Sequence, residues 1–271
     1  MGHHENDKSF VGSLPQIYQS HLVPLVFEPY AEDMARRLAG RPVRRLLEMA
    51  AGTGAVTRKL ASTLPARTSI VASDLNQAML DQAAALGTSR PVDWRRADAM
   101  ELPFEDGEFD AVVCQFGVMF FPDKPRAFAE ARRVLRPGGT LLFNVWDRIE
   151  ENDFASTITT ALADRFPADP PRFLVRTPHG YTDVAAIQRD LTAGGFTAGP
   201  RIAAVPARSR AESPEVPAIG YCQGTPLRNE IEARGAALNE VTDLVTEALA
   251  RQFGRGSVDG KIQAVVVEVE R

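Results

Sequence analysis

The sequence contains little of what identifies several large classes of protein. It has two cysteines, Cys114 and Cys222, and no cysteine or histidine spacing typical of a zinc site, which excludes a disulfide framework and indicates no metal. No apolar run approaches the roughly 18 residues of a membrane-spanning helix, and the polar residues 1–9 do not resemble a signal peptide. We therefore expect a cytoplasmic protein that does not associate with a membrane.

Charge of one sign is also scarce. The net charge is −4, from 31 basic and 35 acidic residues, and the basic residues are scattered along the chain. This balance gives no electrostatic reason to expect nucleic acid as a partner. The 271 residues are 44% apolar and 24% charged, which is ordinary for a globular protein with one large domain or one domain and an added cap. We expect a monomer or a homodimer.

The first half of the sequence alternates regularly between strands and helices. Short apolar segments predict five strands, over residues 43–49, 69–73, 92–97, 111–116 and 140–146. Amphipathic segments between them predict helices over residues 53–64, 76–86 and 123–135. Repeated β-α-β units predict an α/β fold, with a Rossmann-like, mostly parallel sheet and helices on both faces.

The pattern is less regular on both sides of this region. Residues 15–22 and 30–39 predict two helices before the first strand. After residue 150 the expected elements are helices over 153–165, 182–193 and 228–253, strands over 201–205 and 262–269, a proline-rich hinge over 166–178 and a polar loop over 221–226.

The most informative stretch is residues 46–55. An apolar run ends there in Glu48, and a tight turn, Gly52-Thr53-Gly54, then opens a helix. Glycine leaves the backbone uncovered, and the amides of a helix N-terminus point toward a bound ligand. Such a turn is typical of sites for nucleoside-bearing ligands, and many nucleotide sites share it.

Two aspartates follow the next two predicted strands. Asp74 ends the second strand, about 20 residues beyond Gly52, where a carboxylate can accept both hydroxyls of a ribose. Asp98 follows the third strand and can accept a hydrogen bond from an exocyclic amine, as adenine offers. Alternatively, Asp74 is a helix N-terminal acid and Asp98 a turn residue. Because the strand ends share one crevice, we favour an adenosine site.

The same turn weakens the case for a dinucleotide. A Gly-x-Gly-x-x-Gly pattern that began at Gly52 would need a glycine at position 57, which is Thr57. An NAD(P)-dependent oxidoreductase is therefore a remote alternative.

With these residues in place, the chain resembles the class I S-adenosylmethionine-dependent methyltransferases, in particular their type-11, ubiquinone-biosynthesis-like family. The resemblance covers roughly residues 43–147. It rests on motifs in the order and at the spacing of that family: Glu48-Met49-Ala50-Ala51-Gly52-Thr53-Gly54, Ser73-Asp74-Leu75-Asn76-Gln77-Ala78-Met79, Asp98-Ala99-Met100-Glu101-Leu102-Pro103-Phe104, Phe109-Asp110, Gln115-Phe116-Gly117 and Arg133-Val134-Leu135-Arg136-Pro137-Gly138-Gly139.

The resemblance implies the cofactor and the organisation of the chain. The cofactor would be S-adenosyl-L-methionine, released as S-adenosyl-L-homocysteine, and the seventh strand would be antiparallel. Four parts would follow one another: an N-terminal helical lid (1–42), an S-adenosylmethionine-binding core (43–147), a variable helical cap and acceptor region that contains one core strand at about 201–205 (148–256), and the last strand of the core sheet (257–271).

Family roles carry over position by position to the first motif. Glu48, Ala50, Gly52 and Gly54 would cradle the methionine part of the cofactor. One departure stands out, because the family usually has glycine where this chain has Ala50. An extra methyl group fits there if the backbone torsions stay negative. Glu48 has an alternative interpretation as a strand-end carboxylate that is simply satisfied by its neighbours.

The remaining implied contacts follow the cofactor from adenine to sulfonium. Asp74 would hold the ribose, and Leu75 and Met79 would pack on the adenine. Asp98 and the Ala99 amide would bind the edge of the adenine. Gln115 and Phe116, which end the fourth strand, would face the amino-acid and sulfonium end.

Catalytic residues stay unknown at this stage. Methyl transfer from a sulfonium requires mainly alignment of the acceptor and exclusion of water, and a general base only for a protonated acceptor. Weak candidates are His21 and Tyr18 in the first helix and His179 in the loop before a cap helix. Tyr18, Phe27 and Tyr30 could wall the site. Core packing explains the aromatic residues equally well, and a lone loop histidine is more often a surface residue.

The sequence therefore predicts an enzyme, an S-adenosylmethionine-dependent methyltransferase that acts on a small molecule. The acceptor atom, whether oxygen, nitrogen or carbon, stays open. The rival from another class is a non-catalytic protein that binds S-adenosylmethionine or S-adenosylhomocysteine for regulation. Intact Asp74, Asp98 and Gly52 support binding under both readings.

Overall fold

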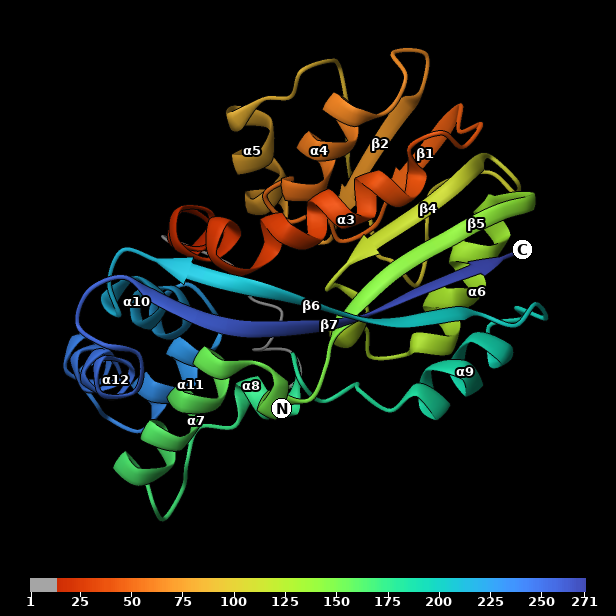
Figure 1. Cartoon of the computed structure of the whole chain (residues 1–271). Helices are drawn as coiled ribbons and strands as arrows, with labels where there is room; N and C mark the ends of the chain where they lie inside the picture. Colours follow the sequence, from red (N-terminus) through yellow and green to blue (C-terminus); the bar gives the residue numbers. More distant parts are fainter. Residues whose placement is uncertain (1–13) are drawn as a thin grey trace. The chain divides into compact units, whose positions relative to one another are not determined.

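The computed structural model describes residues 14–271, so the polar N-terminus and the first part of the expected lid lie outside the described residues. A seven-stranded sheet with the order β3-β2-β1-β4-β5-β7-β6 runs through the molecule (Figure 1). Its strands are β1 Arg45–Glu48, β2 Ser69–Asp74, β3 Asp93–Arg96, β4 Phe109–Gln115, β5 Leu135–Trp146, β6 Arg201–Ala211 and β7 Val258–Glu270. The expected α/β fold with seven strands is confirmed.

The register explains where a ligand can bind. β1 pairs in parallel with β2 on one side and with β4 on the other, and β4 pairs in parallel with β5. The strand order therefore reverses at β1, and the crevice beyond the carboxyl ends at such a switch point is where open α/β sheets bind ligands.

The last strand is antiparallel to β5, as expected. The Asp147 amide donates to the Gln263 carbonyl, whereas Arg271 exchanges backbone hydrogen bonds with Gly138 and Gly139. As the residue number increases along β5, the residue number of its partner in β7 decreases, which is the pattern of an antiparallel pair.

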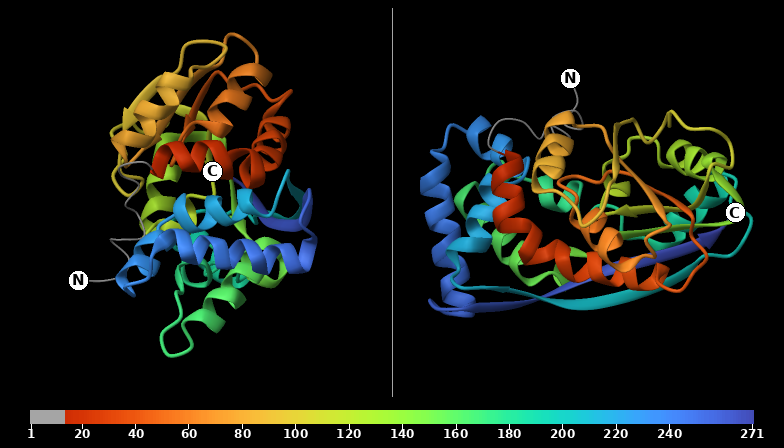
Figure 2. Two further views of the ribbon diagram at one scale, coloured as in Figure 1. Left: turned by 90° about the vertical axis from the view of Figure 1, so that its left-hand side faces the viewer. Right: turned by 90° about the horizontal axis from the view of Figure 1, so that it is seen from above.

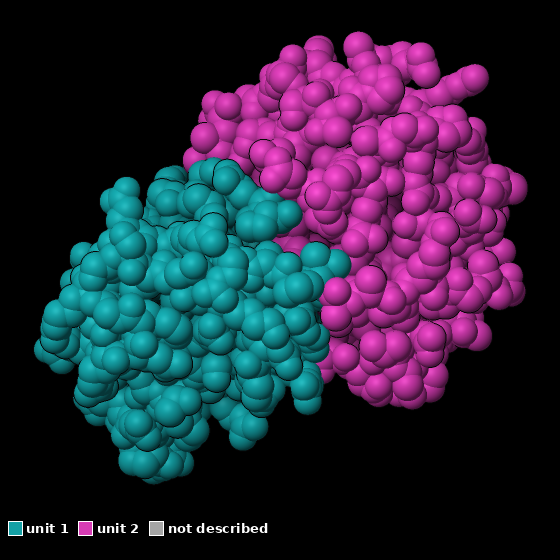
Figure 3. All heavy atoms as spheres, in the orientation of Figure 1, with its two compact units in different colours: residues 1–29, 146–180, 205–264 teal, residues 30–145, 181–204, 265–271 magenta. Residues whose placement is uncertain are grey.

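The described chain forms two compact units (Figure 3). Unit 2 comprises residues 30–145, 181–204 and 265–271, and unit 1 comprises the rest of the described residues, up to 29, 146–180 and 205–264. The helices of unit 2 are α3 Glu28–Leu38 (which begins in unit 1), α4 Ala55–Thr63, α5 Gln77–Leu86, the short η2 Val118–Phe120, α6 Lys124–Val134 and α9 Val184–Ala193.

Unit 2 has helices on both faces of its strands. In Figure 1, α3 and α4 lie on one side of β4 and β5, and α6 and α9 lie on the other. The central strands are apolar because both faces are covered, and Phe109, Phe128 and Phe143 are fully buried between sheet and helix. α6 begins where the Asp123 carboxylate accepts a hydrogen bond from the Arg126 amide at 3.0 Å, a typical N-cap.

Unit 1 is mostly helical. Its helices are α2 Leu14–Ile17, the π-helix η1 Tyr18–Phe27, the short η3 Ile149–Glu151, α7 Asp153–Arg165, α8 Phe173–Arg176, α10 Glu215–Gln223, α11 Leu227–Ala233 and α12 Leu238–Phe253. α10 and α12 lie side by side in both views of Figure 2. Across residues 14–271, no helix combines the length and the apolar character needed to cross a membrane.

Two expectations about unit 1 are wrong, and a third is right about the helix but not about its type and end. The expected helix over 228–253 is broken, because Gly235 adopts a φ of +69° between α11 and α12. The expected polar loop over 221–226 starts inside α10, where Tyr221 and Cys222 are buried. The expected helix over 15–22 continues as a π-helix to Phe27.

Three strands are longer than the sequence pattern indicates, and one of them is β7, which begins at Val258 rather than at residue 262. β5 begins at Leu135 rather than at residue 140, and its register against β4 shifts between Phe109 and Ala111. This irregularity accommodates Pro137-Gly138-Gly139, residues that read as a break because proline and glycine disfavour regular strands. β6 likewise continues to Ala211, well beyond residue 205.

The packing of unit 2 gives a stability prediction. Phe143 of β5 is fully buried, with its ring centroid 5.3 Å from that of Phe128 of α6. We expect Phe143→Ala to lower the free energy of unfolding by about 3–5 kcal/mol, since it removes buried apolar area and leaves a cavity. Urea denaturation measures this. Leu86→Ala is the control, because Leu86 is 45% exposed, and it should change the value by less than about 0.5 kcal/mol. A loss below about 1 kcal/mol in Phe143→Ala would contradict the packing.

Candidate functional site

The candidate site lies at the carboxyl ends of β1 and β2, in unit 2. The Gly52 backbone N–H donates to Asp74 Oδ2 at 2.9 Å, and the Asn76 amide donates to Asp74 Oδ1 at 2.8 Å. One carboxylate therefore joins the glycine turn to the end of the neighbouring strand and to the start of α5. Burial raises the pKa of Asp74, although its hydrogen bonds to Asn76 and Gly52 act in the opposite direction.

The two glycines of the turn differ in what surrounds them. Gly52 and Gly54 have φ values of +56° and +80°. A Cβ on Gly54 would lie 3.0 Å from the Trp94 ring, so this glycine is needed for close packing. A Cβ on Gly52 would meet only the Met79 methyl, at 3.7 Å. Space beside Gly52 is therefore open to a ligand.

Glu48 is the last residue of β1, just before this turn, and its side chain is buried. It is 1% exposed, and the Thr57 hydroxyl donates to its Oε2 at 2.6 Å. Burial raises the pKa of Glu48 to about 8, and the Thr57 hydrogen bond opposes this only in part. Glu48 is thus a neutral acid near pH 7. In the sequence, Thr57 was noted only because a dinucleotide-binding motif would need glycine at that position. Its hydrogen bond to Glu48 was not predicted.

The turn also contains a polar atom without a partner. Thr53 Oγ1 is fully buried and makes no hydrogen bond among the described residues. The same is true of Asn144 Nδ2, at the end of β5. Buried polar atoms of this kind need an explanation, and a bound ligand or an ordered water is the usual one.

The residues expected around adenine lie at the ends of β2 and β3. Leu75 is 42% exposed although it is a large apolar residue, whereas Met79 is buried. Asp98 and Ala99 are both half-buried, and Asp98 Oδ1 accepts a hydrogen bond from the Met100 amide at 2.9 Å. This bond matches the alternative reading of Asp98 as a turn residue, and it leaves Oδ2 for another donor.

The ends of β1 and β4 contain two strained residues. Ala50 has a φ of +53° and Phe116 a φ of +52°, so the methyl group of Ala50 is accommodated without the negative torsions that were given as its condition. The Phe116 amide donates to the Asn144 backbone carbonyl at 3.2 Å and to Asn144 Oδ1 at 3.0 Å. Left-handed residues other than glycine cost of order 1–3 kcal/mol each and concentrate at functional sites. Gln115, directly before Phe116, is half-buried.

Gly117 makes room for the methyl group of Ala50. A Cβ on Gly117 would lie 2.5 Å from Ala50 Cβ and 2.8 Å from Cys114 Sγ. The side chain of Ala50 thus faces Gly117. The alanine fits at position 50, where the family has glycine, because Gly117 has no side chain.

The weak catalytic candidates have different environments. Tyr30 is fully buried and packs edge-on against Phe116, with ring centroids 5.3 Å apart, so it is a core residue of unit 2. Tyr18, His21 and His179 belong to unit 1. The expectation that His179 is more often a surface residue is wrong, because His179 is 9% exposed. His21 is half-buried, and its Nδ1 lies 2.8 Å from the Ser20 hydroxyl.

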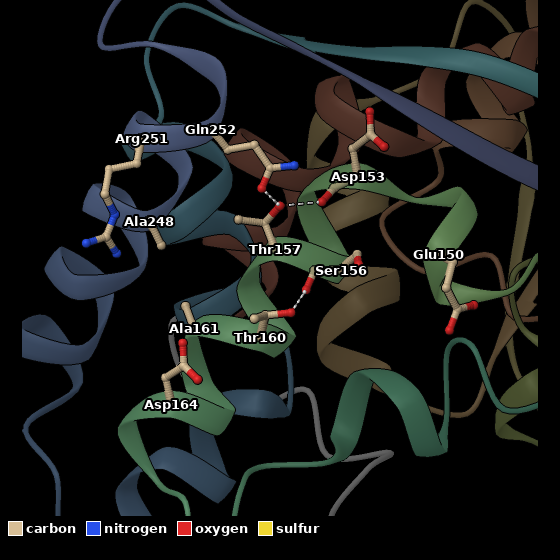
Figure 4. A pocket seen from close by; sticks show the side chains of 10 residues that line it. All are labelled: Glu150, Asp153, Ser156, Thr157, Thr160, Ala161, Asp164, Ala248, Arg251 and Gln252. Atoms are coloured by element: carbon tan, nitrogen blue, oxygen red, sulfur yellow. Dashed lines mark hydrogen bonds between the residues drawn. The ribbon is translucent and has the colours of Figure 1, made fainter.

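A separate groove of about 510 Å³ lies in unit 1 and is polar (Figure 4). It is lined by residues of η3, α7 and α12: Glu150, Asp153, Ser156, Thr157, Thr160, Ala161, Asp164, Ala248, Arg251 and Gln252. The Thr157 hydroxyl lies 2.8 Å from both the Asp153 carbonyl and Gln252 Oε1. None of the expected site residues lines this groove. In the part of the chain that the structure describes, no histidine, cysteine or carboxylate cluster could hold a metal ion.

The contact between Ala50 and Gly117 can be tested by a double-mutant cycle. Gly117→Ala should lower the free energy of unfolding by about 1–3 kcal/mol, because the new methyl group overlaps Ala50. Ala50→Gly in the same chain should recover part of this loss, since glycine removes the overlap and fits a positive φ. Urea denaturation of the four proteins gives the coupling. Gly199→Ala, in open space, is the control. Effects that add within about 0.5 kcal/mol would show that the two positions do not touch.

Comparison with known proteins is consistent with this geometry. Residues 47–143 match the family described as "Methyltransferase domain". The chain is 35% identical over 104 residues to a 2-phytyl-1,4-naphtoquinone methyltransferase of Synechococcus elongatus, a match that covers 37% of this chain and 45% of that protein. It is 41% identical over 106 residues to the ubiquinone/menaquinone biosynthesis C-methyltransferase UbiE of Ectopseudomonas mendocina, over 38% of this chain and 41% of that protein. The matches thus span less than half the length of these relatives.

The fold has a counterpart among solved structures. A phosphoethanolamine N-methyltransferase 2 of Haemonchus contortus, solved with S-adenosyl-L-methionine, superposes with a TM-score of 0.58 at 17% identity, over 95% of this chain and 56% of that one. Identity this low shows the fold alone. The matched residues 47–143 contain the glycine turn and both aspartates, as the resemblance predicts. The similarity to the methyltransferase domain family is thus shown for residues 47–143, the part of the chain that contains the candidate site.

Proposed function

We propose that this protein binds S-adenosyl-L-methionine at the carboxyl ends of β1, β2 and β3 and transfers its methyl group to a small-molecule acceptor. The observation that carries the proposal is the join between Asp74 and the glycine turn, with a hydrogen bond of 2.9 Å to the Gly52 amide. A carboxylate held at this place is suited to a ribose, and the open side of Gly52 is suited to the rest of the nucleoside. Glu48, Ala50, Gly54, Gln115 and Phe116 complete the proposed cofactor contacts toward the methionine end.

The residues present fit this cofactor chemically. The cofactor has an adenine ring, a ribose, and a methionine part with an ammonium, a carboxylate and a sulfonium. Exposed Leu75 offers an apolar face for the ring, and Asp98 Oδ2, which has no donor among the described residues, is available to the adenine amine. The buried Thr53 hydroxyl and the neutral Glu48 carboxyl lie at the turn where the polar methionine end would lie.

The bound cofactor supplies an activated methyl group, so the chain needs to supply alignment. The methyl group moves in line from sulfur to the nucleophilic atom of the acceptor, and S-adenosyl-L-homocysteine is released. Strained Ala50 and Phe116 fix the turn and the end of β4 in one conformation, which supports precise placement of the cofactor. A proton leaves the acceptor only if the reacting atom carries one.

The acceptor is a small molecule in this proposal. Two of the chain's relatives are named for methyltransferases of naphthoquinones and of ubiquinone and menaquinone biosynthesis. These matches cover 37% and 38% of this chain, which supports the reaction type more than the acceptor.

Titration calorimetry with S-adenosylmethionine, S-adenosylhomocysteine and NAD tests the cofactor. Binding of both methionine nucleosides without binding of NAD is expected. Tight NAD binding with no response to the nucleosides would overturn the proposal. Screening of phenols, quinols and amines for methylated products then tests turnover, and cofactor binding with no product across such panels would favour a regulatory binding protein.

Removal of the Asp74 carboxylate should weaken the cofactor complex. We expect Asp74→Ala to raise the dissociation constant for S-adenosylmethionine about 5- to 150-fold, the effect of losing charge-assisted hydrogen bonds worth about 1–3 kcal/mol. Calorimetry measures this. Asp93→Ala is the matched control, because the Asp93 carboxylate is about half exposed and pairs only with Arg95 among the described residues. An unchanged affinity in Asp74→Ala would place the ribose elsewhere.

Cofactor binding should also release a proton. Burial holds the pKa of Glu48 at about 8, so at pH 7 this carboxyl is mostly protonated in the free protein. The nearby ammonium and sulfonium charges of the cofactor favour the ionised form and lower the pKa. Calorimetry at pH 7 in phosphate and in Tris detects the proton as a buffer-dependent heat. Glu48→Gln should abolish the buffer dependence. Equal heats in the two buffers for the unmodified protein would show that Glu48 does not sense the cofactor.

A further inference from the structure

Asn144 of β5 holds the strained residue that directly follows β4. The Phe116 amide donates to two oxygens of Asn144 at once, the side-chain Oδ1 at 3.0 Å and the backbone carbonyl at 3.2 Å. The carbonyl bond continues the parallel pairing of β4 with β5, in which Gln115 lies opposite Asn144. The Oδ1 bond is therefore an addition to the sheet, and it acts on the residue whose φ is +52°.

The conformation of Phe116 determines how the chain leaves β4. A left-handed residue other than glycine turns the backbone sharply and persists only where neighbouring contacts hold it. The next residue, Gly117, lies so close to the segment beyond β1 that a Cβ on it would be 2.5 Å from Ala50 Cβ. The Phe116 ring packs edge-on against Tyr30 of α3. Asn144 thus fixes, through Phe116, the backbone that joins the ends of β1 and β4.

The amide nitrogen of the Asn144 side chain has no protein partner. Asn144 is fully buried, and among residues 14–271 no atom accepts a hydrogen bond from its Nδ2. A buried donor without an acceptor destabilises a fold, whereas an apolar side chain of the same shape does not. With leucine at position 144, which has nearly the shape of asparagine, the Phe116 amide would still have the backbone carbonyl as its partner. Folding alone therefore favours leucine, and the presence of asparagine indicates that its Oδ1 meets another requirement.

The Asn144 side chain lies beside the residues proposed for one end of the cofactor. Phe143, the preceding residue, packs on Phe128 of α6, and successive side chains of a strand point to opposite faces of the sheet. The Asn144 side chain therefore lies on the face covered by α3 and α4 (Figure 1), near the carboxyl end of β5. Gln115 and Phe116, which are opposite and bonded to it, are the residues proposed to contact the methionine end.

We propose that Asn144 is a positioning residue for the methionine end of the cofactor, and that it acts by holding Phe116 in its left-handed conformation. This inference rests on the proposed function and adds a residue of β5, a strand that contributes no other residue to the proposed contacts. Asn144 acts through Phe116 and not on the reacting atoms. Its removal should therefore weaken the contacts of the methionine end and leave those of the adenosine, which are made at the ends of β2 and β3, unchanged.

Two thioether nucleosides separate the two ends of the cofactor. S-adenosylhomocysteine carries the amino-acid part, and 5′-methylthioadenosine has a methyl group in its place, while the adenosine and the neutral sulfur are the same. Titration calorimetry gives the dissociation constant of each. In Asn144→Leu we expect the constant for S-adenosylhomocysteine to rise about tenfold and that for 5′-methylthioadenosine to change less than about twofold. The urea midpoint of unfolding should stay the same or rise, because leucine removes the unpaired donor.

Two further variants complete the test. Asn144→Asp keeps the acceptor oxygen for the Phe116 amide, and burial raises the pKa of a carboxyl group, so the acid stays neutral near pH 7. This variant should recover most of the affinity for S-adenosylhomocysteine that Asn144→Leu loses. Thr140→Val is the matched control, because Thr140 is a buried polar residue four positions earlier in the same strand and bonds only to Arg41 among the described residues. It should leave the ratio of the two constants unchanged.

Several results would overturn the proposal. One is a loss of affinity in Asn144→Leu that is equal for both nucleosides, and another is unchanged binding of S-adenosylhomocysteine. A lower urea midpoint in Asn144→Leu, or its failure to fold, would make Asn144 a residue of the fold alone, and no recovery in Asn144→Asp would show that Oδ1 is not what matters. If the unmodified protein binds neither nucleoside, the proposed function itself fails, and this result is distinct from the others.

Discussion

The hydrogen bond between the Gly52 amide and the Asp74 carboxylate is the constraint on which the rest of the candidate site depends. It fixes the distance between the end of β1 and the end of β2, and through the Asn76 amide it also fixes the start of α5. Asp74 is nearly buried, so these donors replace the water that its charge would otherwise need. The glycine turn, the open space at Gly52 and the exposed Leu75 all take their positions from it.

The backbone is strained just beyond the ends of β1 and β4. Ala50 and Phe116 both have positive φ values, and neither is a glycine. Gly117 admits the methyl group of Ala50, and Asn144 holds the Phe116 amide through two oxygens. Such conformations persist when the surrounding contacts determine them, and in return the backbone has one well-defined shape where a reacting group must be aligned.

Sequence reasoning was most successful where a function depends on local order along the chain. Alternating strands and helices gave the α/β sheet, and the positions of Asp74 and Asp98 followed from the strand ends that precede them. It could not decide cases that depend on distant segments. Whether Tyr30 walls the site or packs in the core was left open, and its ring packs against Phe116, which directly follows β4. The expected helix over 228–253 fails at Gly235, a breaker visible in the sequence that the apolar periodicity outweighed.

The sequence by itself determined the glycine turn, the two aspartates and the class of cofactor that such a turn suits, since each depends on residue type and short spacing. Only the tertiary structure decided that burial raises the pKa of Glu48, that Ala50 is left-handed and that His179 is buried. These are properties of an environment rather than of a residue. Desolvation and steric fit are set by groups that pack from other parts of the chain, and their effect on a side chain appears only once those groups are in place.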